Sequence, residues 1–368
     1  MDKKNQRPEF HGSDLEKIAA YYHIPASEIP GIIKFGANVN PLGLSESVKN
    51  DLAGHLDIIS SYPDRNYTSL KKTIGEYCHI SPEHIVVGNG STELISLLIS
   101  QRQAKKALVV GPTYSEYERE LALTGGTITE YNLKEDLNFQ LDMQDFFASM
   151  ADDVDLLILC NPNNPTSSAI KNHDMKQILT FCKERNIFVM IDETYVEFAP
   201  DVAEITAIPL TDEFDNVMVI RGVSKFYAAP GLRFGYGITS NHDFLEALLI
   251  HQNPWSLNSV AAYAGEHMFK DSAYQQATRQ LICSERGRMY TAIQNMPAFK
   301  AYKPYANFIL VRILKEGITS FDIFEAAIKE RMMIRDCSSF KSLDGEYIRF
   351  CIMNPEDNTH LLKLLEQF

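Results

Sequence analysis

The sequence predicts an α/β fold, with a large domain built on a mainly parallel sheet, a smaller α+β C-terminal domain and an N-terminal arm. Short apolar runs alternate with longer amphipathic stretches through the middle of the chain, a pattern typical of a sheet covered by helices on both faces. After about residue 250 the pattern changes to helices followed by short strands. At 368 residues the chain is also longer than one compact core of the usual size.

The arm is expected over residues 1–45, the large domain over 46–252 and the small domain over 253–368. The arm contains one predicted helix, at 14–22. Apolar runs in the large domain predict buried strands at 85–87, 107–110, 156–160, 187–191 and 217–220. The elements predicted in the small domain are helices at 260–269 and 272–293, and strands at 308–312 and 347–352 with a helix between them.

The last four of the large-domain strands are each followed by residues that suit a loop carrying chemistry. These runs are Gly-Pro-Thr-Tyr, Asn-Pro-Asn-Asn-Pro, Asp-Glu-Thr-Tyr and Arg-Gly-Val-Ser-Lys. Ligands in open α/β sheets lie beyond the carboxyl ends of the strands, so we expect these loops to converge on one crevice.

The composition limits the partners and the location of the chain. A formal charge of −13 argues against nucleic acid or an anionic membrane as the main partner, because either would attract a basic surface. The six cysteines show neither a CxxC pair nor metal-ligand spacing, so we expect no metal site and reduced thiols. The N-terminal residues lack an apolar signal segment, and no apolar run approaches the roughly 18 residues of a membrane span. A cytoplasmic protein that acts on a small molecule is expected.

Lys225 follows a buried strand and is the first candidate for catalysis. A lysine in such a position is by itself usually a solvated loop residue. Arg233 lies eight residues further on, in a Gly-Leu-Arg-x-Gly turn that can return its guanidinium to a phosphate that Ser224 also contacts. These neighbours favour a lysine beside a bound phosphate.

Gly90, Ser91 and Thr92 follow a strand and begin an apolar helix. A glycine turn with a helix N-cap explains such a run in many proteins. The backbone N–H groups of a helix N-terminus also bind anions. Together with Ser224 and Arg233, this segment predicts a phosphate site built from several strand ends.

Asp192 closes an apolar strand, where a carboxylate is costly unless a cation faces it. A helix N-cap is the alternative use of such a residue. Facing a protonated pyridine nitrogen, Asp192 would keep the ring an electron sink. Tyr195 and Asn164 can then bond the phenolic oxygen of the ring, and Tyr114 can stack on it. The lysine, the phosphate site and the carboxylate together predict pyridoxal 5′-phosphate (PLP) as the cofactor.

Five motifs in this order resemble those of the fold type I PLP enzymes of the class I/II aminotransferase family: Gly-x-Gly-x-Thr-Glu, Asn-Pro-Asn-Asn-Pro-Thr, Asp-Glu-x-Tyr, Ser-Lys and Gly-Leu-Arg-x-Gly. The resemblance covers nearly the whole chain and implies the fold type I PLP-dependent transferase fold. It implies that Lys225 holds PLP as a Schiff base, that Asp192 faces the pyridine nitrogen, and that Asn164 lies at the phenolic oxygen. The phosphate cup that it implies consists of Gly90, Ser91, Ser224 and Arg233.

Within the family, the chain resembles the threonine-phosphate decarboxylases of cobalamin biosynthesis more than the histidinol-phosphate aminotransferases. Residues 253–258, Asn-Pro-Trp-Ser-Leu-Asn around the only tryptophan, are the most discriminating stretch. Two arginines suit a substrate with both a carboxylate and a phosphate. Without the resemblance, Arg349 would be an outward-facing charge on an alternating strand and His11 a surface histidine. The substrate site that the resemblance implies consists of His11, Gly12, Asn38, Asn164, Arg335 and Arg349.

Three positions depart from the patterns of the relatives. Ser167 stands where the family usually has glycine, which changes a turn. Gly222 stands where relatives often carry a serine for the cofactor phosphate. Tyr195 resembles the aminotransferases, whereas the decarboxylase has phenylalanine at this position.

Substrate anchoring selects the reaction, because the bond that stands perpendicular to the cofactor ring is the one that breaks. Loss of the carboxylate of threonine phosphate, with a proton returned by Lys225, gives aminopropanol phosphate. Removal of the α-proton instead gives transamination of histidinol phosphate or an aromatic amino acid. A PLP-binding regulator is a third class, but such regulators usually carry a DNA-binding module, for which the sequence before residue 40 has neither room nor basic charge.

The resemblance also implies a homodimer with the active site at the interface. Tyr62, or Tyr67 just beyond it, would reach the cofactor phosphate of the neighbouring subunit, and we prefer Tyr62. The alternative is a turn tyrosine that packs within its own chain.

Overall fold

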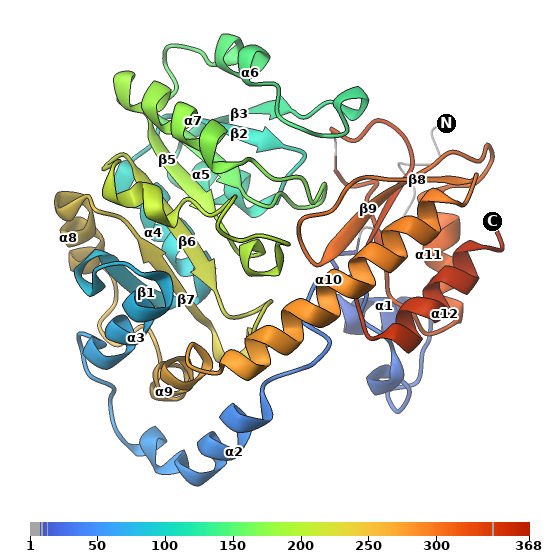
Figure 1. Cartoon of the computed structure of the whole chain (residues 1–368), viewed down its shortest axis with the longest axis horizontal. Coiled ribbons are helices and arrows are strands. Elements are labelled where there is room, and N and C mark those ends of the chain that lie inside the picture. The colour runs from blue at the N-terminus through green and yellow to red at the C-terminus, as the bar shows by residue number, and fades with distance from the viewer. Residues whose placement is uncertain (1–7, 9, 13, 341) are drawn as a thin grey trace.

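The computed structural model describes residues 8, 10–12, 14–340 and 342–368 (Figure 1). A seven-stranded sheet in the order β1-β7-β6-β5-β4-β2-β3 dominates the large domain. β7 runs antiparallel to both of its neighbours, and the other neighbouring strands are parallel, so the predicted α/β fold is confirmed. The strands are β1 (Ile85–Asn89), β2 (Lys106–Gly111), β3 (Thr127–Asn132), β4 (Leu156–Cys160), β5 (Phe188–Asp192), β6 (Val217–Gly222) and β7 (Phe234–Ile238).

Helices cover both faces of this sheet because its strands are apolar on both sides. Along β4, Leu156 and Ile158 pack into one apolar cluster, whereas Leu157 and Leu159 pack into another. The first cluster includes residues of α4 (Gly90–Arg102), α5 (Glu116–Leu123) and α8 (His242–His251). The second includes residues of α3 (Thr68–Cys78), α6 (Met143–Ser149), α7 (Asn172–Glu184) and α9 (Ser259–Met268).

The small domain contains a four-stranded antiparallel sheet in the order β10-β11-β9-β8. Arg335 on β10 pairs with Arg349 on β11, so the two arginines predicted to bind substrate lie on neighbouring strands. The long helix α10 runs from the large sheet to the small one (Figure 1). The elements are α10 (Ser272–Gln294), β8 (Phe299–Ala301), β9 (Phe308–Ile313), α11 (Ser320–Lys329), β10 (Arg335–Asp336), β11 (Tyr347–Cys351) and α12 (Pro355–Leu365).

The arm carries α1 (Leu15–Tyr21) and packs on the small domain. It is followed in the sequence by α2 (Glu46–Gly54). Ile33 forms a parallel bridge with Met332, and the N–H of Gly36 donates to the carbonyl oxygen of Met333 at 2.6 Å. The loop at 36–40 is thereby held beside the strands that carry the two arginines. Short 3-10 turns complete the described chain: η2 (Ile29–Gly31), η3 (Leu56–Ser60), η4 (Pro82–His84), η5 (Glu135–Leu137), η6 (Val196–Phe198), η7 (Ile208–Asp212) and η8 (Pro230–Leu232).

All the strands and helices that the sequence predicts are present, with ends shifted by at most two residues. Four strands were missed. β3 exposes most of its residues, β7 reads Phe-Gly-Tyr-Gly-Ile with two weak strand formers, and β8 and β10 have only three and two residues. The domain boundaries at 45 and 252 stay predictions. Within the described part of the chain, no helix is long and apolar enough to span a membrane.

Gly235 allows β7 to pass against the start of α4. A Cβ added at Gly235 would lie 2.4 Å from the backbone nitrogen of Ser91 and 2.6 Å from the carbonyl carbon of Gly90. Real Cβ atoms do not approach backbone atoms this closely, so β7 and α4 would have to separate. Glycine at this position therefore sets the distance between the turn after η8 and the N-terminus of α4.

Gly235→Ala is expected to lower the free energy of unfolding by about 1 to 3 kcal/mol, because the added methyl overpacks this contact. Gly231→Ala is the matched control, since a Cβ there meets nothing within 4 Å. It should stay within about 0.5 kcal/mol of the parent. Urea unfolding of the three proteins measures both effects, and equal stability of the two variants would contradict the packing argument.

Candidate active site

A cavity of about 720 Å³ lies at the carboxyl ends of the parallel strands. Loops that follow β2, β4, β5 and β6 line it together with the arm loop at 36–40, so the predicted convergence is confirmed. A second cavity of about 440 Å³, which Arg335 lines, adjoins it and shares several of its residues. The predicted site residues that line the first cavity are His11, Gly12, Asn38, Ser91, Thr92, Tyr114, Asn164, Asp192, Tyr195, Ser224, Lys225, Arg233 and Arg349.

Lys225 comes three residues after β6 and lines this cavity. Its Nζ donates to the carbonyl oxygen of Ala37 at 2.7 Å, so the arm loop holds the amine in place. Desolvation lowers the pKa of Lys225 from 10.5 to about 8, and the positive charges of Arg349 and Arg233 contribute to the shift. Half of the amine is therefore neutral near pH 8, and a nucleophilic lysine must be neutral to react.

Asp192 is the last residue of β5, and its carboxylate is bonded only to uncharged donors in the described part of the chain. Oδ1 accepts from the N–H of Thr194 at 2.9 Å and from its hydroxyl at 2.5 Å, and Oδ2 accepts from the hydroxyl of Tyr117 at 2.7 Å. A carboxylate has about four acceptor positions, so one remains. A protonated ring nitrogen in the cavity would supply both the missing donor and the missing positive charge.

Tyr195 and Asn164 lie where the large domain meets the arm and the small domain. The amide of Asn38 donates to the hydroxyl of Tyr195 at 3.4 Å, and Arg349 donates to Oδ1 of Asn164 at 2.5 Å. Burial raises the pKa of Tyr195, so its hydroxyl keeps its proton. Oδ1 of Asn38 is buried and accepts no hydrogen bond in the described structure, which leaves an acceptor for a ligand.

The predicted phosphate cup is assembled by close packing around Gly90. This residue has a φ of 77°, and a Cβ added there would lie 2.4 Å from Nη2 of Arg233. A Cβ added at Gly222 would lie 3.7 Å from Oγ of Ser91, so these two residues also lie close together. The guanidinium of Arg233 and the first N–H groups of α4 thus face the same end of the cavity.

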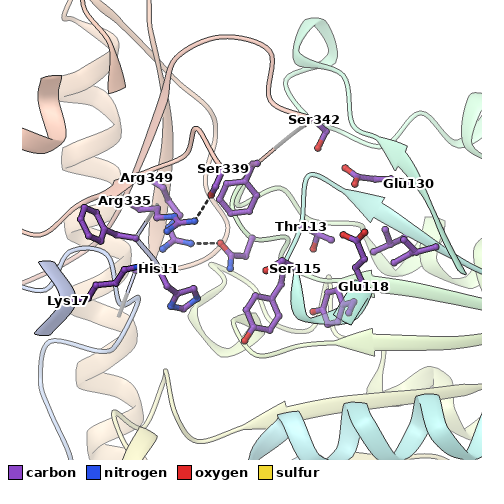
Figure 2. A pocket seen from close by; sticks show the side chains of 18 residues that line it. His11, Lys17, Thr113, Ser115, Glu118, Glu130, Arg335, Ser339, Ser342 and Arg349 are labelled. Atoms are coloured by element: carbon purple, nitrogen blue, oxygen red, sulfur yellow. Dashed lines mark hydrogen bonds between the residues drawn. The ribbon is translucent and has the colours of Figure 1, made fainter. Parts of the chain in front are cut away.

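Figure 2 shows Arg335 and Arg349 side by side next to His11, with Glu118 and Glu130 at the far end of the second cavity. Nη2 of Arg335 donates to Oγ of Ser339 at 2.7 Å, and Nη2 of Arg349 donates to the carbonyl oxygen of Gly36 at 2.7 Å. Nε of Arg349 is buried with no acceptor in the described structure.

In the described chain, the guanidinium groups of Arg335 and Arg349 donate only to uncharged oxygens. Each guanidinium has five N–H donors, so several remain for an anion.

The start of the arm completes this end of the site. A Cβ added at Gly12 would lie 2.2 Å from the carbonyl oxygen of Gly36 and 3.1 Å from Nη2 of Arg349, so only glycine lets the arm approach this closely. Desolvation and the charge of Arg335 lower the pKa of His11. The arm therefore places His11 within the electrostatic reach of both arginines.

Tyr62 does not line either cavity of its own chain. Its side chain is 80% exposed, and its ring lies 4.8 Å from that of Trp255. Tyr67, in contrast, is buried and its hydroxyl donates to the carbonyl oxygen of Leu257 at 2.9 Å. Of the two candidates for reaching a neighbouring subunit, Tyr62 alone is available, but its role stays a prediction.

Ser167 has a larger role than the change of turn that the sequence suggests. It has a φ of 58°, the left-handed conformation that favours glycine. Its hydroxyl accepts hydrogen bonds from the N–H groups of Ala306 at 2.9 Å and Tyr305 at 3.2 Å. The serine thus bonds the loop that carries Asn164 to the small domain.

Three residues that the sequence did not single out support the site. Tyr117 and Thr194 hold the carboxylate of Asp192, and Ser339 holds Arg335. Thr194 lies inside the Asp-Glu-Thr-Tyr run, so the motif itself contained a signal. Tyr117 is separated from Asp192 by 75 residues, and no local pattern connects them.

Residues 30–365 match the sequence model of the family described as aminotransferase class I and II. The chain belongs to this family. It is 35% identical over 355 residues to the threonine-phosphate decarboxylase of Salmonella typhimurium, covering 96% of this chain and 95% of that protein. It is 32% identical over 358 residues to the adenosylcobalamin biosynthesis bifunctional protein of Leptospira interrogans, covering 96% of this chain and 40% of that protein.

A solved structure supports the same family. The histidinol-phosphate aminotransferase from Clostridium acetobutylicum matches with a TM-score of 0.83 and 33% identity, over 90% of this chain and 97% of that chain. The resemblance inferred from the five motifs and the fold type I architecture are both confirmed.

Members of the class I and II aminotransferase family use PLP, and the predicted cofactor is confirmed. The residues of this chain fit the group. Asp192 has uncharged partners and an acceptor position to spare, the lowered pKa of Lys225 leaves more of its amine in the neutral form, and Gly90 brings Arg233 to a helix N-terminus. Each of the three features matches one part of the cofactor: its ring nitrogen, its aldehyde and its phosphate.

The rate at which the apoenzyme takes up PLP covalently should depend on the pKa of Lys225. Below pH 8 the amine is mostly protonated and uptake should be slow; the rate should rise through pH 8 and level off above it. Stopped-flow absorbance of the bound cofactor measures this rate, with Lys225→Ala as the control that forms no covalent band. A rate that keeps rising toward pH 10.5 would show a lysine with an ordinary pKa.

Proposed function

We propose that the enzyme catalyses the PLP-dependent decarboxylation of L-threonine O-3-phosphate to aminopropanol phosphate, a step of cobalamin biosynthesis. The observation that carries this proposal is the pair of guanidinium groups of Arg335 and Arg349, which lie on paired strands beside the cavity of Lys225. The likeness to a threonine-phosphate decarboxylase and to an adenosylcobalamin biosynthesis protein supports the same substrate and pathway.

The two guanidinium groups favour a substrate with two anions. Arg349 is only 5% exposed, and the acceptors it meets in the described chain are the uncharged oxygens of Asn164 and Gly36. A buried charge without a counter-charge is costly, and a bound anion removes much of that cost. A guanidinium can bind an anion through two parallel N–H donors, like a fork. Arg335 provides a second such fork next to that of Arg349, and His11 provides a further donor, so a carboxylate and a phosphate can be held together.

When bound, PLP supplies an electron sink for bond breaking at the α-carbon of the substrate. Lys225 would hold the cofactor, Asp192 would keep its ring nitrogen protonated, and Asn164 and Tyr195 would bond its phenolic oxygen. Arg335 and Arg349 would orient the carboxylate that leaves as carbon dioxide. With its lowered pKa, Lys225 would then deliver a proton to the α-carbon. The residues that would hold the cofactor phosphate are Gly90, Ser91, Thr92, Ser224 and Arg233.

An aminotransferase acting on histidinol phosphate or an aromatic amino acid is the second candidate. Tyr195 and the 33% identity to a histidinol-phosphate aminotransferase of known structure favour it. Histidinol phosphate brings one anionic group, whereas threonine phosphate brings two, and two forks suit the latter better. Transamination also requires a 2-oxo acid as amino acceptor, whereas decarboxylation requires none, so a single assay separates the two reactions.

The holoenzyme is expected to release carbon dioxide from L-threonine O-3-phosphate in the absence of any 2-oxo acid. Arg335→Gln and Arg349→Gln should each raise KM about a hundredfold, because each removes one fork and leaves an anion unpaired. Arg119→Gln, which changes a 61% exposed arginine on α5, is the control and should change KM less than about twofold. Turnover that depends on 2-oxoglutarate, with no carbon dioxide released, would favour the aminotransferase instead.

We also propose that the enzyme is a homodimer in which Tyr62 reaches the cofactor phosphate of the neighbouring subunit. Four large apolar side chains support an interface near Tyr62: Leu56, Ile59, Tyr62 and Trp255 are 41 to 80% exposed. Light scattering should give twice the mass of 41.7 kDa, and Tyr62→Phe should weaken PLP binding about tenfold. A fully active monomer would contradict this assembly.

A further inference from the structure

The link between β3 and α6 leaves the large domain, contacts the small domain and returns (Figure 1). Glu135, in η5, accepts two hydrogen bonds and forms a further ion pair, and all three partners come from the small domain. Lys300 Nζ lies 2.5 Å and the hydroxyl of Tyr302 2.7 Å from Oε1, and Nη1 of Arg312 lies 3.1 Å from Oε2. One carboxylate therefore joins β8, β9 and the connection between them to the large domain.

Phe139 strengthens the same contact. It is only 2% exposed, and its ring centroid lies 4.8 Å from that of Tyr302 and 6.1 Å from that of Tyr347. Its φ is 56° and that of Asn138 is 52°, both in the left-handed region. A bulky residue adopts this conformation only where the surroundings enforce it, so the turn is shaped to insert Phe139 between the two tyrosines.

This contact is connected directly to the predicted substrate arginines. Arg312 pairs with Tyr347 across β9 and β11, and Tyr347 lies two residues before Arg349 on the same face of β11. Arg349 in turn pairs with Arg335 on β10. Since a hydrogen-bonded sheet moves as a unit, a shift at Tyr347 would move both guanidinium groups relative to the cavity.

Two hydrogen bonds and a second ion pair on one carboxylate give Glu135 more influence than an isolated surface ion pair has. The hydrogen bonds from Lys300 and Tyr302 lower the pKa of Glu135, so it is ionised at neutral pH. Without its charge, Lys300 and Arg312 would face each other as like charges, which repel. Repulsion between β8 and β9 would act on the sheet that carries the arginines.

We propose that Glu135 is a positioning residue that sets the place of Arg335 and Arg349 over the cofactor cavity, and with it the affinity for a substrate carrying two anions. The proposal deepens the proposed function and rests on it. Glu135 acts through the small-domain sheet and touches neither substrate nor cofactor.

Glu135→Gln keeps the shape of the side chain and removes its charge, and Asp136→Asn is the matched control, one residue away and exposed. In the holoenzyme, Glu135→Gln should raise KM for L-threonine O-3-phosphate about tenfold while the dissociation constant of PLP stays within about twofold. Asp136→Asn should match the parent. Lys300→Met should raise KM about threefold, and adding it to Glu135→Gln should lower KM again, because it removes the repulsion.

An unchanged KM in Glu135→Gln, or a double variant worse than both single ones, would overturn the proposal. Lys300→Met keeps the test valid if Glu135→Gln does not fold, since an unchanged KM in that variant would also overturn it. If the parent enzyme neither binds nor converts L-threonine O-3-phosphate, the proposed function fails. Inorganic phosphate then serves as the probe of the arginines, and equal affinity in the parent and Glu135→Gln would overturn the positioning role.

Discussion

The guanidinium of Arg349 lies where the three parts of the chain meet. It donates to the side chain of Asn164 in the large domain and to the backbone of Gly36 in the arm, and it is carried by β11 of the small domain. Gly12 packs directly against it. The guanidinium is buried, and its Nε has no acceptor in the described structure. The two oxygens that accept from its Nη1 and Nη2 are uncharged. Since the described residues that accept from this group carry no charge, the site is organised around a positive charge that a ligand can balance.

The cofactor end of the cavity shows the complementary arrangement of charge. Asp192 presents a carboxylate whose hydrogen-bond partners are uncharged. Lys225, just after β6, and Arg233, just after η8, present positive charges to the same cavity. The chain as a whole carries a formal charge of −13, yet the residues around the cavity favour anions. Local fields in a cleft depend on the groups that line it rather than on the net charge. The parallel sheet creates the cofactor end, because β5 and β6 deliver Asp192 and Lys225 to one edge.

Much of the fold could be predicted because its signals are local. The buried central strands are continuous apolar runs, and each ends in a motif with a recognisable use, so strands such as β4 and residues such as Lys225 and Asp192 stand out. β3 has one buried residue in six and so lacks such a run, and in β7 the glycine that permits contact with Ser91 also hides the strand. The features that serve close packing thus obscured the pattern.

The order of the motifs by itself determined the family and the cofactor and predicted the lysine that would hold it, since these depend on residue types at short spacing. Only the tertiary structure decided how the domains are held together around the site. The bonds from Tyr117 to Asp192, from Ala306 to Ser167 and from Lys300 to Glu135 join residues 75, 139 and 165 positions apart. Contacts over such separations arise from tertiary packing, within the large domain for Tyr117 and Asp192 and between the two domains for the other pairs, which no local periodicity encodes. The sequence therefore predicts the role of Lys225, whereas the position of Arg335 and Arg349 relative to the cavity depends on the tertiary structure.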